Sequence, residues 1–178
     1  EAAFPGFQRD SRSDRLPEVH DDWHHTQGRV GPIKGIDSTV AIHMAECCHP
    51  VRGDRTVGIQ VENKGVEVHT IDCSRLAAYD DKPELWLDLG WHESAGDDIY
   101  YVARLRLEVM NERGALAAIA AVVAKAGGNI SNLEIFDRDP EFYLMNVDID
   151  VQDAKHLNDI SRALRVNRVI GRVDRVSG

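Results

Sequence analysis

The segment from Val109 to Ile130 constrains the fold of this chain more than any other. It reads as the end of a strand, a tight turn, an amphipathic helix over residues 117–126, and a second strand that begins after two glycines. The helix is indicated by apolar residues spaced i, i+3, i+4 and i+7, which form one stripe along one face. These residues are Leu116, Ile119, Ala120 and Val123. The stripe requires a surface on which to pack.

Both ends of this helix carry stop or start signals. Gly127 and Gly128 stand where a helix terminus favours a positive φ, which glycine adopts without Cβ strain. Asn111 is a good capping residue, and Gly114 allows a sharp turn. Because the first-turn N–H groups and the helix dipole are positive there, the turn could hold a carboxylate. The alternative is an ordinary strand-to-helix connection, and local physics leaves both readings open.

The residues around this helix complete a recognisable order of elements. Alternating apolar and polar residues predict further strands, and Asp153 is placed to cap a second helix with an apolar stripe. The strands are expected at 101–109, 129–136, 142–151 and 168–176, and the stripe is Leu157, Ile160 and Leu164. The order β-α-β-β-α-β predicts a four-stranded antiparallel sheet with both helices on one face. The open face invites pairing with a second copy.

A smaller α+β module precedes this domain, over residues 39–93. It has strand patterns at 40–44, 56–61, 66–71 and 85–89 and a short helix at 74–79, but its apolar content is thin for its length. Domains of this size often need a metal or a neighbour for stability. Thiol and imidazole groups suit tetrahedral zinc, so a metal site is one reading and reduced, packed thiols are the other. The four residues concerned are Cys47, Cys48, His69 and Cys73.

Composition excludes several classes of protein. No apolar run among the 178 residues is long enough for a transmembrane span or a signal peptide. The net charge of -9 argues against a general attraction to nucleic acid, and three cysteines suit a reducing cytoplasm. Arginines are denser near the end of the chain. They could form an RNA-facing patch or, alternatively, a solvated helix and strand face. They are Arg162, Arg165, Arg168, Arg172 and Arg175.

Residues 1–38 have no helical or strand period, so we expect a linker or lead-in. Its histidines, His20, His24 and His25, lack a matching second set of metal ligands and are expected to be solvated. Small and acidic residues at 94–98 mark a second boundary, so the last domain is expected over 97–178. The first residue is Glu1 rather than Met, which is typical of a fragment or a processed chain.

Two sets of motifs resemble a known family. The segments 111–116 (NERGAL) and 127–130 (GGNI) are similar to those of ACT domains, which are ferredoxin-like regulatory modules. The segments 45–50 (AECCHP) and 65–73 (GVEVHTIDC), with Gly53-Asp54 between them, resemble the conserved-cysteine or zinc-finger module of the RelA/SpoT family. That module followed by an ACT domain resembles the C-terminal end of bifunctional (p)ppGpp synthetase/hydrolase proteins. Arg52 departs from the pattern, because many members have a second proline there.

The resemblance implies a cytoplasmic regulatory chain without its own enzymatic activity, attached to catalytic domains upstream in a GTP diphosphokinase and (p)ppGpp 3'-pyrophosphohydrolase. It implies zinc at Cys47, Cys48, His69 and Cys73. It also implies that valine, isoleucine or leucine binds between two subunits of an ACT homodimer, and that the bound amino acid biases the upstream hydrolase against the synthetase. The implied ligand residues are Asn111, Glu112, Arg113, Gly114, Ala115, Leu116, Asn129 and Ile130. The alternative is a module without a small-molecule ligand that docks on the ribosome, RNA or a regulatory protein.

Overall fold

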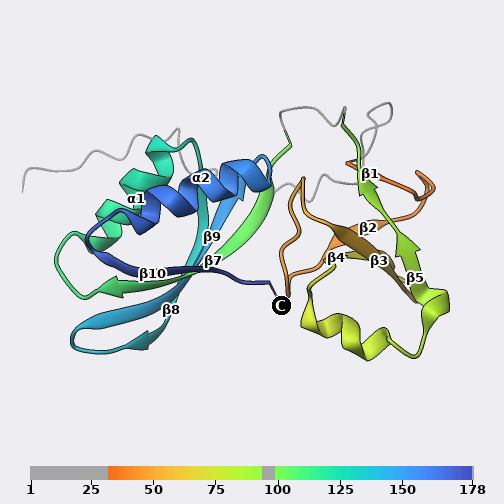
Figure 1. Cartoon of the computed structure of the whole chain (residues 1–178), viewed down its shortest axis with the longest axis horizontal. Coiled ribbons are helices and arrows are strands. Elements are labelled where there is room, and N and C mark those ends of the chain that lie inside the picture. Colours follow the sequence, from red (N-terminus) through yellow and green to blue (C-terminus); the bar gives the residue numbers. More distant parts are fainter. Residues whose placement is uncertain (1–31, 94–98, 178) are drawn as a thin grey trace, which may run out of the picture.

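The computed structural model describes residues 32–93 and 99–177, which form two α+β domains (Figure 1). The expectations for the lead-in up to residue 31, including its three histidines, lie outside the described residues. The boundary expected at residues 94–98 lies outside them as well. No helix within the described ranges is long and apolar enough to cross a membrane.

The second domain has the predicted order of elements and the predicted layers. Its strands lie in the order β10-β7-β9-β8, every neighbouring pair is antiparallel, and both helices cover one face of the sheet (Figure 1). The elements are β7 (Tyr101–Met110), α1 (Ala115–Lys125), β8 (Asn129–Arg138), β9 (Phe142–Val151), α2 (Ala154–Arg165) and β10 (Ile170–Arg175). The ferredoxin-like α+β arrangement expected from the sequence is therefore confirmed.

The core of this domain lies between the sheet and the helices. Alternate residues of β7 and β9 are buried, as strand periodicity requires. The stripe expected on α2 is buried too, and the Asp153 carboxylate caps α2 by accepting a hydrogen bond of 2.7 Å from the His156 N–H. Burial of each such leucine or isoleucine contributes on the order of 1.5–3 kcal/mol before chain entropy is subtracted.

Two expectations for α1 are wrong. The helix begins at Ala115, and Ala115, Ile119 and Val123 are its buried residues, whereas Leu116 is 44% exposed. Ala120 is exposed as well. Ile119 and Val123 are buried as expected, but Ala115 is buried instead of Leu116, because alanine and leucine both satisfy an apolar period and only packing chooses between them.

Asn111 does not cap α1. Gly114 is the N-cap residue, with φ at +86° and no side-chain capping bond. The Asn111 amide group instead donates to the Asp139 carbonyl oxygen at 3.3 Å, and its backbone N–H donates to the Glu141 carbonyl oxygen at 2.8 Å. Asn111 therefore ties the β7–α1 turn to the β8–β9 turn.

The first domain is built on a smaller mixed sheet in the order β2-β4-β3-β5. Its elements are β2 (Ile42–Met44), β3 (Thr56–Val61), β4 (Gly65–Thr70), the 3-10 helices η2 (Ser74–Tyr79) and η3 (Pro83–Leu85), and β5 (Trp86–Asp88). A separate ribbon pairs β1 (Ile33–Lys34) with β6 (Gly90–Trp91). Nothing in the sequence pattern predicted β1, because a two-residue strand is too short to show a period.

The open face of the larger sheet is polar at its centre. Arg104 on β7 donates to both carboxylate oxygens of Asp148 on β9, at 2.6 and 2.7 Å, and Asn132 on β8 donates to the same carboxylate at 3.2 Å. These bonds, chiefly the one from Arg104, hold the pKa of Asp148 below its ordinary value. This face is therefore less suited to pairing with a second copy than the sequence suggested.

We predict that Asp148→Ala lowers the free energy of unfolding by about 2–3 kcal/mol, because it leaves the Arg104 guanidinium without its carboxylate. The depressed pKa of Asp148 means that this contribution is complete above the unfolded-state value of about 3.9. It is lost as the pH falls through the lower folded-state value.

Urea unfolding of wild type and variant at neutral pH measures this effect. The matched control is Asp174→Ala, which removes the exposed ion pair between Asp174 and Arg172 and should cost less than about 1 kcal/mol. Equal losses in the two variants would contradict the prediction.

Candidate functional site

The four predicted metal ligands come together in the first domain. Cys47 and Cys48 lie in the turn after β2, His69 lies on β4, and Cys73 lies just after β4. Their four ligand atoms lie within 4.8 Å of one another. The Cys47 sulfur is 3.4 Å from the Cys73 sulfur and 3.5 Å from His69 Nδ1, which is 3.8 Å from the Cys48 sulfur.

These separations fit the edges of a tetrahedron around one metal ion. With metal–sulfur bonds of about 2.3 Å, two sulfurs of a tetrahedral site lie about 3.8 Å apart, and a sulfur and a nitrogen lie slightly closer. Adjacent cysteines can both contribute because they occupy a turn, in which the Cys48 and His49 N–H groups both donate to the Ala45 carbonyl oxygen. The residues present therefore fit a tetrahedral metal with thiolate and imidazole ligands.

Two neighbours complete the surroundings of this cluster, and sequence reasoning missed both. The Thr70 N–H donates to the Cys48 sulfur at 3.4 Å, and a Glu67 carboxylate oxygen lies 3.7 Å from His69 Nε2. His69 presents Nδ1 to the thiols, and the Glu67 oxygen lies beyond hydrogen-bond distance of the outer nitrogen, where metal-binding imidazoles often have a carboxylate. The i, i+2 spacing of Glu67 and His69 on one strand is the signal that could have revealed the first of these neighbours.

Burial sets the protonation of the cluster. It raises the pKa of the Cys47 thiol to about 12, with a further contribution from the hydrogen bond to Cys73. It also raises the pKa of Cys48 and lowers the pKa of His69. Burial thus favours the neutral thiols of Cys47 and Cys48 and the neutral imidazole of His69, and a bound cation would reverse the preference of these two thiols.

The predicted ligand loop lies at one end of the second domain. Residues 111–114 form the exposed turn between β7 and α1, and the Leu116 side chain is exposed beside them. Ala115 is 3% exposed, so its side chain faces the core rather than a ligand. The loop also borders a shallow pocket that sequence reasoning did not find, whose other wall is the α2–β10 connection at 166–169.

The structure does not bring Asn129 to this loop within one chain. Asn129 begins β8 opposite Asp150, whereas Asn111 follows Met110, which lies opposite Phe142. Eight residues of β9 separate the two positions, a distance of roughly 26 Å. The Asn129 side chain instead donates to the Asp150 carboxylate at 2.8 Å. A site containing both asparagines therefore requires two chains.

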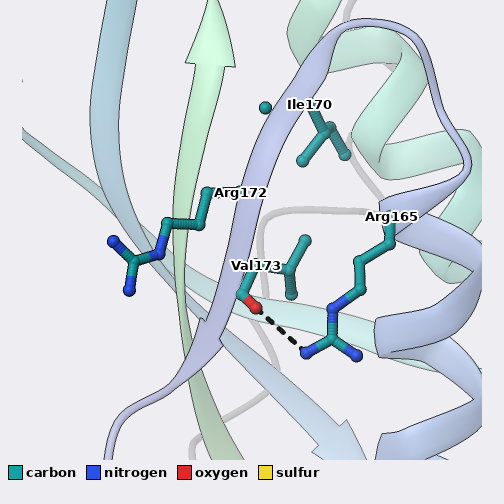
Figure 2. A pocket seen from close by; sticks show the side chains of 5 residues that line it. Arg165, Ile170, Arg172 and Val173 are labelled. Atoms are coloured by element: carbon teal, nitrogen blue, oxygen red, sulfur yellow. Dashed lines mark hydrogen bonds between the residues drawn. The ribbon is translucent and has the colours of Figure 1, made fainter.

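A second shallow pocket lies against β10. Figure 2 shows Arg165 and Arg172 on opposite sides of this strand. The Arg165 guanidinium donates to the Val173 carbonyl oxygen at 3.0 Å (Figure 2), and Arg172 pairs with Asp174 at 2.6 Å. Arg165 and Arg172 therefore do not lie on one face of this strand (Figure 2).

Comparison with known families assigns both domains. A model of the RelA/SpoT RIS domain matches residues 31–92, and a model of the ACT domain matches residues 99–175. The chain is a RIS–ACT region of the RelA/SpoT family. The cysteine cluster belongs to the RIS domain, and the loop at 111–114 belongs to the ACT domain.

Relatives of this RIS–ACT region are longer proteins. It is 35% identical over 150 residues to the GTP pyrophosphokinase rsh of Brucella ovis, covering 84% of this chain and 20% of the relative. It is 30% identical over 135 residues to the bifunctional (p)ppGpp synthase/hydrolase SpoT of Escherichia coli K12, covering 76% and 19%. The chain thus spans about a fifth of these relatives. The solution structure of the ACT domain of a Chlorobium tepidum GTP pyrophosphokinase has a TM-score of 0.39 at 23% identity, covering 44% of this chain and 89% of that one.

Proposed function

We propose that this RIS–ACT region regulates a bifunctional (p)ppGpp synthetase/hydrolase in the cytoplasm by binding a free amino acid between two ACT domains. Valine, isoleucine and leucine are the proposed ligands. The observation that carries the proposal is the position of Asn111 and Asn129 at opposite ends of one sheet. One chain cannot close such a site, whereas two chains related by a twofold axis can.

The free edge of β8 offers the required contact. This strand is the last in the order β10-β7-β9-β8, and none of the described strands pairs with its outer edge. If two copies of β8 paired antiparallel, Asn129 of one copy would lie beside the Arg138 end of the other. That end leads into the turn at 139–141, to which Asn111 is hydrogen-bonded. Pairing along β8 would therefore assemble the ligand residues of two chains.

The chemistry of the assembled residues suits a small amino acid. The amino end of α1, begun by Gly114, attracts a carboxylate, and the asparagine side-chain oxygens accept hydrogen bonds from an ammonium group. The exposed Leu116 side chain and the half-buried Ile130 supply an apolar wall. Because the ligand would bind one arrangement of the two chains better, it would shift the population of arrangements and bias the catalytic domains upstream.

We also propose that the metal in the RIS domain is zinc. Three thiolates and one imidazole in a tetrahedral arrangement are a common structural zinc site, and such sites stabilise small domains. Cys47, Cys48, His69 and Cys73 would hold the ion, and its role would be to cross-link the turn after β2 to β4 and the start of η2.

The docking alternative is less well supported by the arginines that suggested it. Arg162 pairs with Asp159, Arg168 with Glu112, Arg172 with Asp174 and Arg175 with Asp54. Their charge is thus partly neutralised within the chain. An RNA or ribosome contact would have to break these pairs, and its affinity would fall steeply with salt.

We predict that Asn111→Ala weakens binding of valine, isoleucine and leucine by about tenfold or more, since it removes one polar contact with the ligand and the side-chain hydrogen bond to the Asp139 carbonyl oxygen. Isothermal titration calorimetry of the chain, freed of carried-over ligand by refolding, measures the affinity. The control is Asn167→Ala, on the far wall of the neighbouring pocket. No binding of any amino acid by the wild-type chain would overturn the proposed function.

We predict that Leu133→Lys yields a monomer and abolishes amino-acid binding together. Leu133 is 36% exposed at the middle of β8, so it would lie close to its own copy across the twofold axis, where two lysines would repel each other. Val166→Lys is the control, because Val166 is 86% exposed and lies after α2, away from β8. Sedimentation equilibrium reports the oligomeric state. A dimeric Leu133→Lys variant would exclude β8 as the interface.

We predict that the purified chain holds one zinc ion and that Cys73→Ser loses most of it, because a neutral hydroxyl is a poor zinc ligand. Metal content by inductively coupled plasma mass spectrometry is the measurement. Ser74→Ala, one residue further on at the start of η2, is the control and should retain the ion. Equal zinc content in both variants would remove Cys73 from the ligand set.

A further inference from the structure

A six-residue loop connects the cysteine cluster of the RIS domain to the ACT domain. We call residues His49–Asp54 the docking loop; it begins directly after Cys48 and ends before β3. Its shape is set locally, since the Asp54 carboxylate accepts a hydrogen bond of 2.8 Å from the Val51 N–H and the Asp54 N–H donates to the Val51 carbonyl oxygen at 3.0 Å. The loop is therefore a compact unit.

The tip of the docking loop is inserted into the ACT domain. The Val51 side chain is fully buried and belongs to the core formed by β7, β9 and α2. The Arg52 carbonyl oxygen accepts a hydrogen bond of 2.8 Å from the N–H of Ala154, the first residue of α2. A Cβ added to Gly53 would lie 3.4 Å from the Ala154 Cβ, so the loop backbone is close-packed against the helix.

The base of the docking loop is held by Arg175, the last residue of β10. Its guanidinium donates to the Asp54 carboxylate through both terminal nitrogens, one of them at 2.8 Å, and to the His49 carbonyl oxygen at 3.1 Å. The Asp54 side chain is 12% exposed, so solvent screens this pair weakly. Trp91 adds a further bond from its indole N–H to the Asp54 carbonyl oxygen at 2.8 Å, and its ring packs edge-on against Tyr101 at 5.2 Å.

The other end of the loop is held by the cluster. His49 adopts a φ of +47°, uncommon for a residue with a side chain, immediately after the two adjacent cysteines. A metal bound to Cys47 and Cys48 would cross-link this turn to His69 and Cys73, which lie more than twenty residues away. Without that cross-link, the turn from which the loop begins would lose one of its long-range restraints.

We propose that the docking loop couples metal binding in the RIS domain to the packing of the RIS domain against the ACT domain. With metal bound, the Cys47–Cys48 turn presents Val51 and the Arg52 carbonyl oxygen to the ACT core and to α2; when metal leaves, the loop withdraws and the two domains part. This inference goes beyond amino-acid sensing, because none of these contacts involves residues 111–116 or 129–130. It makes the relative placement of the two domains dependent on metal.

The Ala154 amide reports this coupling directly. As the first residue of α2 it has no acceptor within the helix, so the Arg52 carbonyl oxygen of the other domain protects its hydrogen from exchange. The Met110 amide is the matched reference in the same domain. It donates to the Val169 carbonyl oxygen at 2.8 Å, at the far end of the sheet.

The experiment is amide hydrogen exchange of the nitrogen-15-labelled chain, followed by nuclear magnetic resonance, with zinc bound and after removal of zinc by a chelator. We expect exchange at Ala154 to accelerate about tenfold or more without zinc, while exchange at Met110 changes less than twofold. Unchanged exchange at Ala154 would overturn the proposal. Equal acceleration at both amides, which signals unfolding of the whole ACT domain, or a chain that takes up no zinc, would also overturn it.

Reciprocity gives a second test with a matched pair of variants. If docking and metal binding are coupled, a variant that undocks the loop must lose zinc affinity by the factor by which zinc favours docking, typically fivefold or more. Arg175→Gln should therefore lower zinc affinity, measured by competition with a chromophoric chelator. Arg172→Gln, which alters an exposed pair on the same strand, should not. Equal zinc affinity in the two variants would overturn the coupling and leave the amino-acid proposal untouched.

Discussion

The antiparallel pairing of β7 with β9 is the contact on which the rest of the molecule depends. It runs through ten consecutive residue pairs, from Tyr101 opposite Val151 to Met110 opposite Phe142. One face of this ribbon forms the core with both helices, and the other carries the ion pair of Arg104 with Asp148. Because the ribbon is long, its two ends lie far apart. The predicted ligand loop lies at one end and the RIS domain packs at the other.

The RIS domain shows how a small domain compensates for a limited core. Its buried apolar residues form two small clusters, and one of these contains Cys48 and Cys73. A metal ion at the cysteine cluster would join a turn, a strand and a 3-10 helix in addition to these apolar contacts. Val51, a fully buried residue of the RIS domain, is inserted into the core of the neighbouring ACT domain. The two domains therefore share part of one hydrophobic core.

The arginines near the end of the chain have different roles in the fold from the one that their spacing in the sequence suggested. Five arginines near the end of the chain look like a basic face when they are read in one dimension. In the fold, Arg175 holds the docking loop, Arg165 closes α2 against β10, and Arg162, Arg168 and Arg172 pair with nearby carboxylates. Arg52, which looked like a local departure from the family pattern, lies at the contact between the domains, where its carbonyl oxygen meets the start of α2. The density of arginines along the sequence therefore did not predict how their charges are paired in the fold.

Residue patterns alone predicted the order of the elements, the ferredoxin-like sheet and the four members of the cysteine cluster. Strand and helix periods are local, and thiol and imidazole groups that could hold a metal are chemically distinctive, so both can be recognised in the sequence. Tertiary contacts were needed to show that Ala115 rather than Leu116 is buried, that Gly114 rather than Asn111 is the N-cap of α1, and that Asn111 and Asn129 lie at opposite ends of the sheet. They were also needed to show that His49–Asp54 joins the two domains, because contacts between residues a hundred positions apart leave no period in the sequence.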